Sequence, residues 1–178
     1  DRGYLLDLFL HQSYPGELQK NPYAFEMLDE RPDRVGVTLW RKAMGERVRG
    51  IVVEKTVWLQ PGEVIIPVDY RFRNESECYR SFSFWTQHFT IGGDAATDDM
   101  YYRPGLAGMS AVPYPGGKQF LDVIEEPGAG WTAVYDSEAR AGTVFLFDYH
   151  WLRWIYNSFS AATVEWFMDT VAFSGLEL

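Results

Sequence analysis

The chain has 178 residues, of which 47% are hydrophobic and 23% are charged. These proportions are typical of a globular protein and exclude global disorder. The formal net charge of −9 disfavours nucleic acid and anionic membranes as partners, because both attract proteins through Lys and Arg. Neutral polar ligands such as sugars are compatible with this charge.

The cysteine content and the hydropathy pattern limit the cellular context. Cys78 is the single cysteine, so no disulfide can form within the chain. No apolar run approaches the ~18 residues of a transmembrane helix, and no signal peptide is visible. These features fit a soluble protein, cytoplasmic or secreted. Because the chain starts without methionine and ends in ordered-looking sequence, we expect a fragment of a longer protein.

Alternation of apolar and polar residues dominates the chain and predicts strands with one buried face. Residues 4–11 and 35–40 are expected to be extended, whereas Pro22–Leu28 suggests a helical turn. Two further segments, Ile51–Leu59 and Val64–Phe72, predict a hairpin, because the turn residues Gln60-Pro61-Gly62-Glu63 lie between them.

The second half of the chain continues the strand pattern around one long connection. Tyr79–Thr90 alternates as a strand, and Gly92–Gly117 is rich in Gly, Pro and Asp, which predicts a long loop that is functional, mobile or both. Five later strands are expected at 119–124, 130–135, 142–149, 151–156 and 162–173. About ten strands with almost no helix predict an all-β fold, a large antiparallel two-sheet β-sandwich that forms a single domain over residues 1–178.

Familiar catalytic and cofactor motifs are absent from the sequence. There is no Gly-x-Ser-x-Gly, Walker A, Gly-x-Gly-x-x-Gly, Cys-x-x-Cys or His-Glu-x-x-His motif. One cysteine and three dispersed histidines predict no metal site. Asp94, Asp98 and Asp99 match no standard calcium loop and are interpreted as a solvated acidic loop. We therefore expect no cofactor and no bound metal.

Three polar residues within apolar strands are candidates for catalysis. His88 ends an aromatic strand, where it could bond a sugar hydroxyl or a loop carbonyl. Glu165 has apolar neighbours, so its carboxylate needs either partners or a ligand, or it faces solvent. His150 follows Asp148 by two residues, and the carboxylate could orient the imidazole. For each residue an ordinary structural role is the competing interpretation.

Aromatic side chains are the second set of candidates. Tyr101, Tyr102 and Tyr114 lie in the predicted loop, where a role in the core is least expected. Trp151 lies near Trp154 and Tyr156 on a late strand. Aromatic planes with a polar group can stack on sugar rings. The alternative for the strand residues is core packing.

Several segments together resemble galactose-mutarotase-like supersandwich domains. They are Glu54–Leu59, Val68–Ser76, the histidine strand Trp85–Phe89 and the acidic strand Thr163–Trp166. The resemblance covers residues 35–175 and implies a supersandwich of a carbohydrate-active protein. Gln87 stands where an Asn precedes the histidine in aldose epimerases.

Three functions are therefore considered. The first is an accessory or sugar-binding module, in which His88, Tyr101, Tyr102, Tyr114, Trp151 and Glu165 contact a mono- or oligosaccharide. The second is an aldose epimerase, with Glu165 removing the anomeric proton and His88 or His150 protonating the ring oxygen. The third is a structural domain that braces a neighbouring domain of the same polypeptide through exposed aromatic residues.

Overall fold

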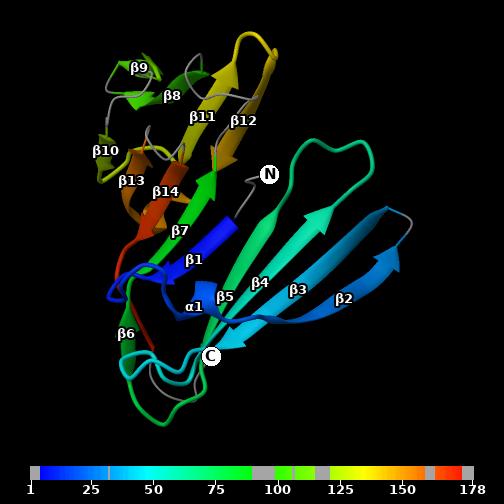
Figure 1. Ribbon diagram of the computed structural model, residues 1–178, viewed down its shortest axis with the longest axis vertical. Helices are drawn as coiled ribbons and strands as arrows, with labels where there is room; N and C mark the ends of the chain where they lie inside the picture. Colours follow the sequence, from blue (N-terminus) through cyan, green and yellow to red (C-terminus); the bar gives the residue numbers. More distant parts are fainter. Residues whose placement is uncertain are drawn as a thin grey trace. The chain divides into compact units, whose positions relative to one another are not determined.

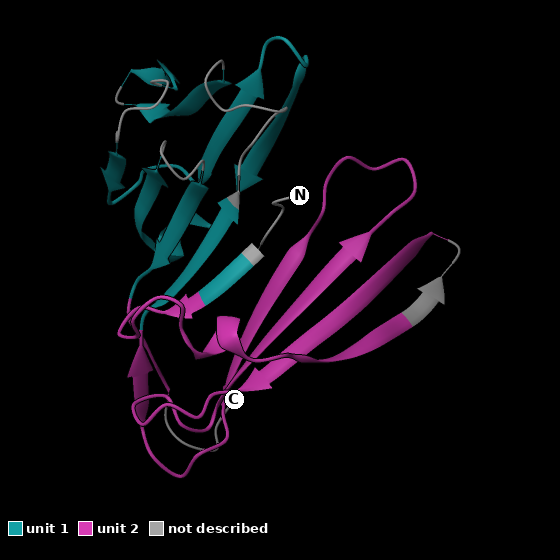
Figure 2. Ribbon diagram, viewed as in Figure 1, with its two compact units in different colours: residues 1–7, 83–169 teal, residues 8–82, 170–178 magenta. Residues whose placement is uncertain are grey.

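The computed structural model describes residues 5–31, 33–89, 99–105, 107–114, 121–158 and 163–173. The chain divides into two compact units, shown in different colours in Figure 2. Unit 1 comprises residues 1–7 and 83–169, and unit 2 comprises residues 8–82 and 170–178. That both units belong to a single domain stays a prediction.

The fold is all-β, as predicted (Figure 1). In unit 2 and at its borders the elements are β1 (Leu5–Phe9), α1 (Glu17–Lys20), β2 (Ala24–Arg31), β3 (Arg34–Lys42), β4 (Ile51–Leu59), β5 (Val68–Asn74), β6 (Arg80–Phe82) and β15 (Val171–Phe173). In unit 1 they are β7 (Phe84–Phe89), β8 (Asp99–Gly105), β9 (Gly108–Pro113), β10 (Leu121–Glu125), β11 (Trp131–Asp136), β12 (Ala141–Leu146), the 3-10 helix η1 (Tyr149–Trp151), β13 (Leu152–Ser158) and β14 (Thr163–Met168).

Unit 1 is a β-sandwich made of two sheets. The larger sheet has the strand order β1-β7-β14-β13-β10, and the smaller has the order β12-β11-β8-β9. Tyr101, Tyr114 and Val134 contact a second group of buried residues, Leu152, Ile155, Val164 and Trp166, from strands β13 and β14 of the larger sheet. Because these side chains come from both sheets, the core of unit 1 lies between them.

Unit 2 contains the four-stranded antiparallel sheet β2-β3-β4-β5 and the short pair β15-β6. Side chains alternate between a largely apolar face and a polar face of the four-stranded sheet, as the pleat requires. Phe25, Leu39, Lys55 and Tyr70 share the first face, and Glu26, Thr38, Thr56 and Asp69 share the second.

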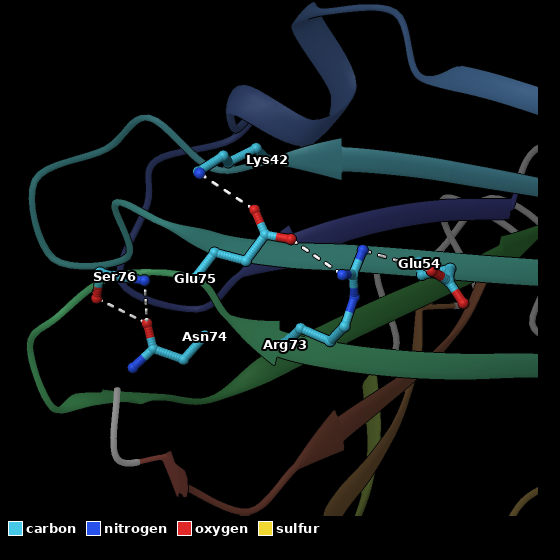
Figure 3. Close-up of polar contacts among 6 residues, drawn as sticks. All are labelled: Lys42, Glu54, Arg73, Asn74, Glu75 and Ser76. Atoms are coloured by element: carbon cyan, nitrogen blue, oxygen red, sulfur yellow. Dashed lines mark hydrogen bonds and ion pairs between the residues drawn. The ribbon is translucent and has the colours of Figure 1, made fainter. Parts of the chain in front are cut away.

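The end of β5 is fixed by the side chain of Asn74, which is 5% exposed. Its Nδ2 atom donates to Cys78 O at 2.8 Å and to Phe173 O at 3.3 Å, and its Oδ1 atom accepts from the amide of Ser76 at 3.0 Å. Close by, Glu75 pairs with Lys42 and Arg73 at 3.1 and 3.0 Å (Figure 3). Asn74-Glu75-Ser76 matches a glycosylation triplet, but its acceptor nitrogen already bonds two carbonyl groups.

Two predicted segments near the N-terminal half differ in the structure. Pro22–Leu28 forms no helical turn, because residues from Ala24 onwards pair with β3 as strand β2. The predicted hairpin of β4 and β5 is confirmed, but β5 begins at Val68. Pro67 has no N–H group to donate, so the ladder cannot continue through it, and the connection is longer than predicted.

The predicted long loop is also wrong in its central part, where β8 and β9 form a hairpin. Strand β8 pairs with β11 only as far as Tyr102. Pro104 lies beyond that pairing, so its missing N–H group removes no hydrogen bond between the two strands. Residues 92–98, 106 and 115–117 of the predicted loop lie outside the described residues. Two other predicted strands are interrupted: Tyr79–Thr90 becomes β6 and β7, and the last strand becomes β14 and β15.

Helical structure within the described residues is confined to α1 and η1, which have four and three residues. None of the helices found there is long and apolar enough to cross a membrane.

Candidate functional site

One face of the larger sheet of unit 1 gathers aromatic and polar side chains around Glu165. The register places Glu165 between Gln87 on β7 and Tyr156 on β13. Directly opposed residues of an antiparallel pair point to the same side of the sheet, so these three side chains share one face. We call it the Glu165 face, and its members are Trp85, Gln87, Leu121, Val123, Glu125, Trp154, Tyr156, Ser158, Thr163, Glu165 and Phe167.

The carboxyl group of Glu165 is buried, with a residue exposure of 7%. Its Oε1 atom accepts hydrogen bonds from Gln87 Nε2 at 2.9 Å and from Thr163 Oγ1 at 3.0 Å. Burial raises the pKa of Glu165, and hydrogen bonds from Gln87, Thr163 and Trp85 offset part of that rise. A carboxyl group whose pKa is shifted by its surroundings is a feature of functional sites.

Aromatic rings surround this carboxyl group on the same face. Phe167 stacks on Trp85 with ring centroids 5.6 Å apart, and its edge contacts involve Trp154 at 5.8 Å and Tyr156 at 6.1 Å. Trp154, Tyr156 and Phe167 are half-buried. Burial raises the pKa of Tyr156, and the nearby charge of Glu165 raises it further, so the hydroxyl stays protonated.

His88 points to the opposite side of the same sheet. It is paired with Val164, one residue before Glu165, and side chains alternate along a strand. Its ring lies 5.2 Å from that of Phe145 on the smaller sheet, and its Nε2 atom contacts Thr86 Oγ1 at 3.0 Å. His88 therefore belongs to the inner side of the sandwich, and Glu165 does not.

His150 lies in η1 and not on a strand. Its Nδ1 atom contacts Asp148 Oδ1 at 2.8 Å, and Asp148 also caps η1 by accepting from the His150 amide at 3.1 Å. The hydrogen bonds from His150 lower the pKa of Asp148. The predicted contact between the carboxylate and the imidazole exists, but it arises from helix capping instead of strand alternation.

The three tyrosines assigned to a loop lie in or beside strands and have different surroundings. Tyr101 and Tyr114 are 0% and 5% exposed and belong to the core of unit 1. The Tyr114 hydroxyl donates to Asn157 Oδ1 at 3.4 Å. Tyr102 lies on the outer side of the smaller sheet, because β8 alternates. The expectation that a core role is least probable here is wrong for Tyr101 and Tyr114.

The remaining candidates are Trp151 and the three acidic residues of the predicted loop. Trp151 is exposed in η1, at 54%. Asp94 and Asp98 fall outside the described residues, whereas Asp99 is buried at the start of β8. Across the described part of the chain, no three His, Cys, Asp or Glu side chains gather as a group that could hold a metal ion.

Sequence reasoning did not select Gln87, Tyr156 or Trp154 as partners of Glu165. The alternation of β7 does place Trp85 and Gln87 on one face, but a single strand does not reveal which strand lies beside it. The pairing of β7 with β14 joins residues 78 positions apart, and only the register makes it visible.

No protein family model matches the chain, and neither a curated protein nor a solved structure shows significant similarity to it. The structure itself defines an all-β protein with a β-sandwich unit. The resemblance to galactose-mutarotase-like domains stays a prediction.

Proposed function

We propose that the chain is a carbohydrate-binding β-sandwich module and that the Glu165 face is its ligand surface. One observation carries the proposal: a carboxylate and an amide, Glu165 and Gln87, are hydrogen-bonded to each other in the middle of aromatic side chains on one sheet face. Sugars present both hydroxyl groups and apolar C–H faces. This surface offers a complement to each of them.

The groups on this face have distinct roles in the proposal. The half-buried rings of Trp154 and Tyr156 provide the planes on which a sugar ring stacks. Glu165 and Gln87 bond hydroxyl groups, because a carboxylate accepts and an amide both donates and accepts. Leu121 and Val123, 53% and 47% exposed on the neighbouring strand β10, extend the apolar part of the surface.

The geometry favours binding over epimerase chemistry. An epimerase of the kind considered needs an acid and a base on opposite ends of one sugar, within hydrogen-bond reach of it. His88 and Glu165 point to opposite sides of one sheet, so this pair does not act on one ligand. His150 is exposed in η1 and is not on the Glu165 face.

The test is a thermal-shift survey of soluble oligosaccharides followed by calorimetry on any sugar that raises the melting temperature. We expect at least one glycan class to stabilise the protein, and we expect Trp154→Ala to weaken that binding about tenfold or more, since a stacked ring contributes about 0.5–1.5 kcal/mol beyond its buried area. Trp131→Ala is the matched control, because Trp131 lies on the outer side of the smaller sheet and not on the Glu165 face. If no glycan in the panel raises the melting temperature, the proposal is contradicted.

A structural role is the second candidate, favoured by exposed apolar side chains on the smaller sheet. Met109, Tyr135, Val144 and Leu146 are 64%, 38%, 62% and 70% exposed. Monomeric proteins rarely leave large contiguous apolar patches uncovered. A flat glycan response together with binding of a neighbouring domain of the same polypeptide through these residues would favour this role over sugar binding.

A further inference from the structure

The outer side of the smaller sheet in unit 1 is uncharged. Direct cross-strand partners Ala133 and Tyr102, Tyr102 and Ala111, and Ala133 and Val144 define this side. Its members, which we call the outer face, are Met100, Tyr102, Pro104, Met109, Ala111, Pro113, Trp131, Ala133, Tyr135, Gly142, Val144 and Leu146. The opposite side of the sheet supplies the core of the sandwich.

Strand β12 forms one edge of that sheet and has none of the usual protection against pairing. Five of its six residues are exposed, and its sequence is Ala-Gly-Thr-Val-Phe-Leu. Its pairing with β11 is regular over all six residues, without a bulge. Natural edge strands are generally blocked by charged residues, proline or bulges, because an open edge is a template for another strand.

The other described edge strands of more than three residues do carry such protection. Asp7 lies in β1, Pro113 ends β9, and Asp122 and Glu125 lie in β10. In unit 2, β2 and β5 contain several charged residues, among them Glu26, Asp69, Arg71 and Arg73. Among the described edge strands of this length, β12 is thus the one without a charged residue, a proline or a bulge.

We propose that β12 pairs with β12 of a second copy of this chain in antiparallel fashion, which joins the two smaller sheets into one continuous sheet. Antiparallel pairing about a two-fold axis through Val144 keeps the two outer faces on the same side. Val144 then lies opposite Val144 of the second copy, and Leu146 lies opposite Gly142, which has no side chain to obstruct it.

The self-complementary register of the uncharged strand β12 favours a second copy as the occupant. Each copy carries a formal net charge of −9, so two copies repel each other wherever acidic residues meet. The uncharged β12 edge and the outer face beside it allow close approach without pairing like charges. An antiparallel two-fold contact is also closed, which limits the assembly to a dimer.

The direct test is the mass of the protein in solution, measured by light scattering after size exclusion at about 1–100 µM. We expect the mass to rise with concentration towards twice the 20.5 kDa of one chain. Val144→Lys places two like charges opposite each other on the axis, which destabilises cross-strand pairs, and we expect at least a tenfold weaker dimer. Val64→Lys is the matched control, because Val64 is 95% exposed and lies in unit 2. The Val64→Lys variant should form the dimer as the wild type does.

Cross-linking gives a second, independent measurement. In a Cys78→Ser background, Val144→Cys places the Cβ atoms of two cysteines about 4.5–5.5 Å apart across the axis, so a short bismaleimide should join two chains. Ser137→Cys, on the turn after β11, should not cross-link. A wild-type protein that stays monomeric over the whole range, or a Val144→Lys dimer as stable as that of the wild type, would overturn the proposal.

Discussion

Gln87 and Glu165 lie directly opposite each other on β7 and β14, and the Gln87 Nε2 atom donates to Glu165 Oε1 over 2.9 Å. The bond joins strands separated by 78 positions in the sequence. It holds a buried carboxylate in place next to aromatic rings.

The first prediction concerns the effect of pH on the stability of Glu165→Gln. Burial raises the folded-state pKa of Glu165 above its ordinary value of 4.5. The folded protein therefore binds this proton more tightly than the unfolded chain, and the stabilisation is complete below pH 4.5 and is lost as pH rises through the raised pKa. A glutamine carbonyl can still accept from Gln87 and Thr163. We expect Glu165→Gln to be at least as stable as the wild type at pH 7.

Urea unfolding between pH 4 and pH 8 checks this expectation. The free energy of unfolding of small proteins falls by about 1–3 kcal/mol per M of urea. The advantage of Glu165→Gln over the wild type should shrink as pH falls. Because other carboxyl groups titrate equally in both proteins, the difference between them isolates Glu165. Two stability curves that run parallel over the whole range would contradict the raised pKa.

The second prediction concerns the core of unit 1. Trp166 is 1% exposed, and its ring stacks on Phe147 with centroids 5.6 Å apart. Trp166→Ala should lower the free energy of unfolding by about 3–5 kcal/mol, through lost burial and the cavity left behind. Trp151→Ala, at a 54% exposed site, should change it by less than about 1 kcal/mol. Equal losses in the two variants would mean that the core is placed wrongly.

The third prediction compares two glycines in the connection before β11. A Cβ atom on Gly130 would overlap the carbonyl oxygen of Phe147 and lie 2.8 Å from the carbonyl carbon, whereas one on Gly128 meets nothing within 4 Å. We expect Gly130→Ala to destabilise the protein by about 1–3 kcal/mol or more and Gly128→Ala to be neutral. Thermal unfolding of both variants decides this, and a neutral Gly130→Ala would show that Phe147 does not lie close to this backbone.

The fourth prediction concerns Asn74 in unit 2. Asn74→Ala leaves the carbonyl groups of Cys78 and Phe173 without this donor, which should cost about 1–3 kcal/mol. Asn21→Ala removes an exposed amide that donates to Glu17 O at 2.9 Å, and should cost less than about 1 kcal/mol. Chemical denaturation measures both, and similar losses would contradict an anchoring role for Asn74.

Much of the fold could be predicted because strand alternation is a local signal. The hairpin of β4 and β5 is an example, since both strands and the turn between them lie within one stretch of sequence. Alternation fails at Val64–Pro67, where the apolar pattern continues but Pro67 ends the ladder. It also fails where turn-forming residues are frequent, as in β8 and β9, because tertiary pairing with β11 outweighs local preference.

The candidate site was only partly predictable for a related reason. Glu165 could be selected from the sequence because a carboxylate within an apolar strand needs partners. His88 was selected with it, yet alternation along β7 and the register with β14 put the two side chains on opposite sides. Register is set by long-range pairing, so no local pattern could establish which side chains meet.

The most direct test of the proposed carbohydrate surface is a titration followed through the indole N–H signals of the seven tryptophans in an NMR spectrum. The titrant is the oligosaccharide that gives the largest thermal shift. We expect the signals of Trp85 and Trp154, both on the Glu165 face, to move with increasing sugar, while that of Trp131, on the outer side of the smaller sheet, does not. Movement confined to Trp131, or no movement at saturating sugar, would contradict the proposed carbohydrate surface.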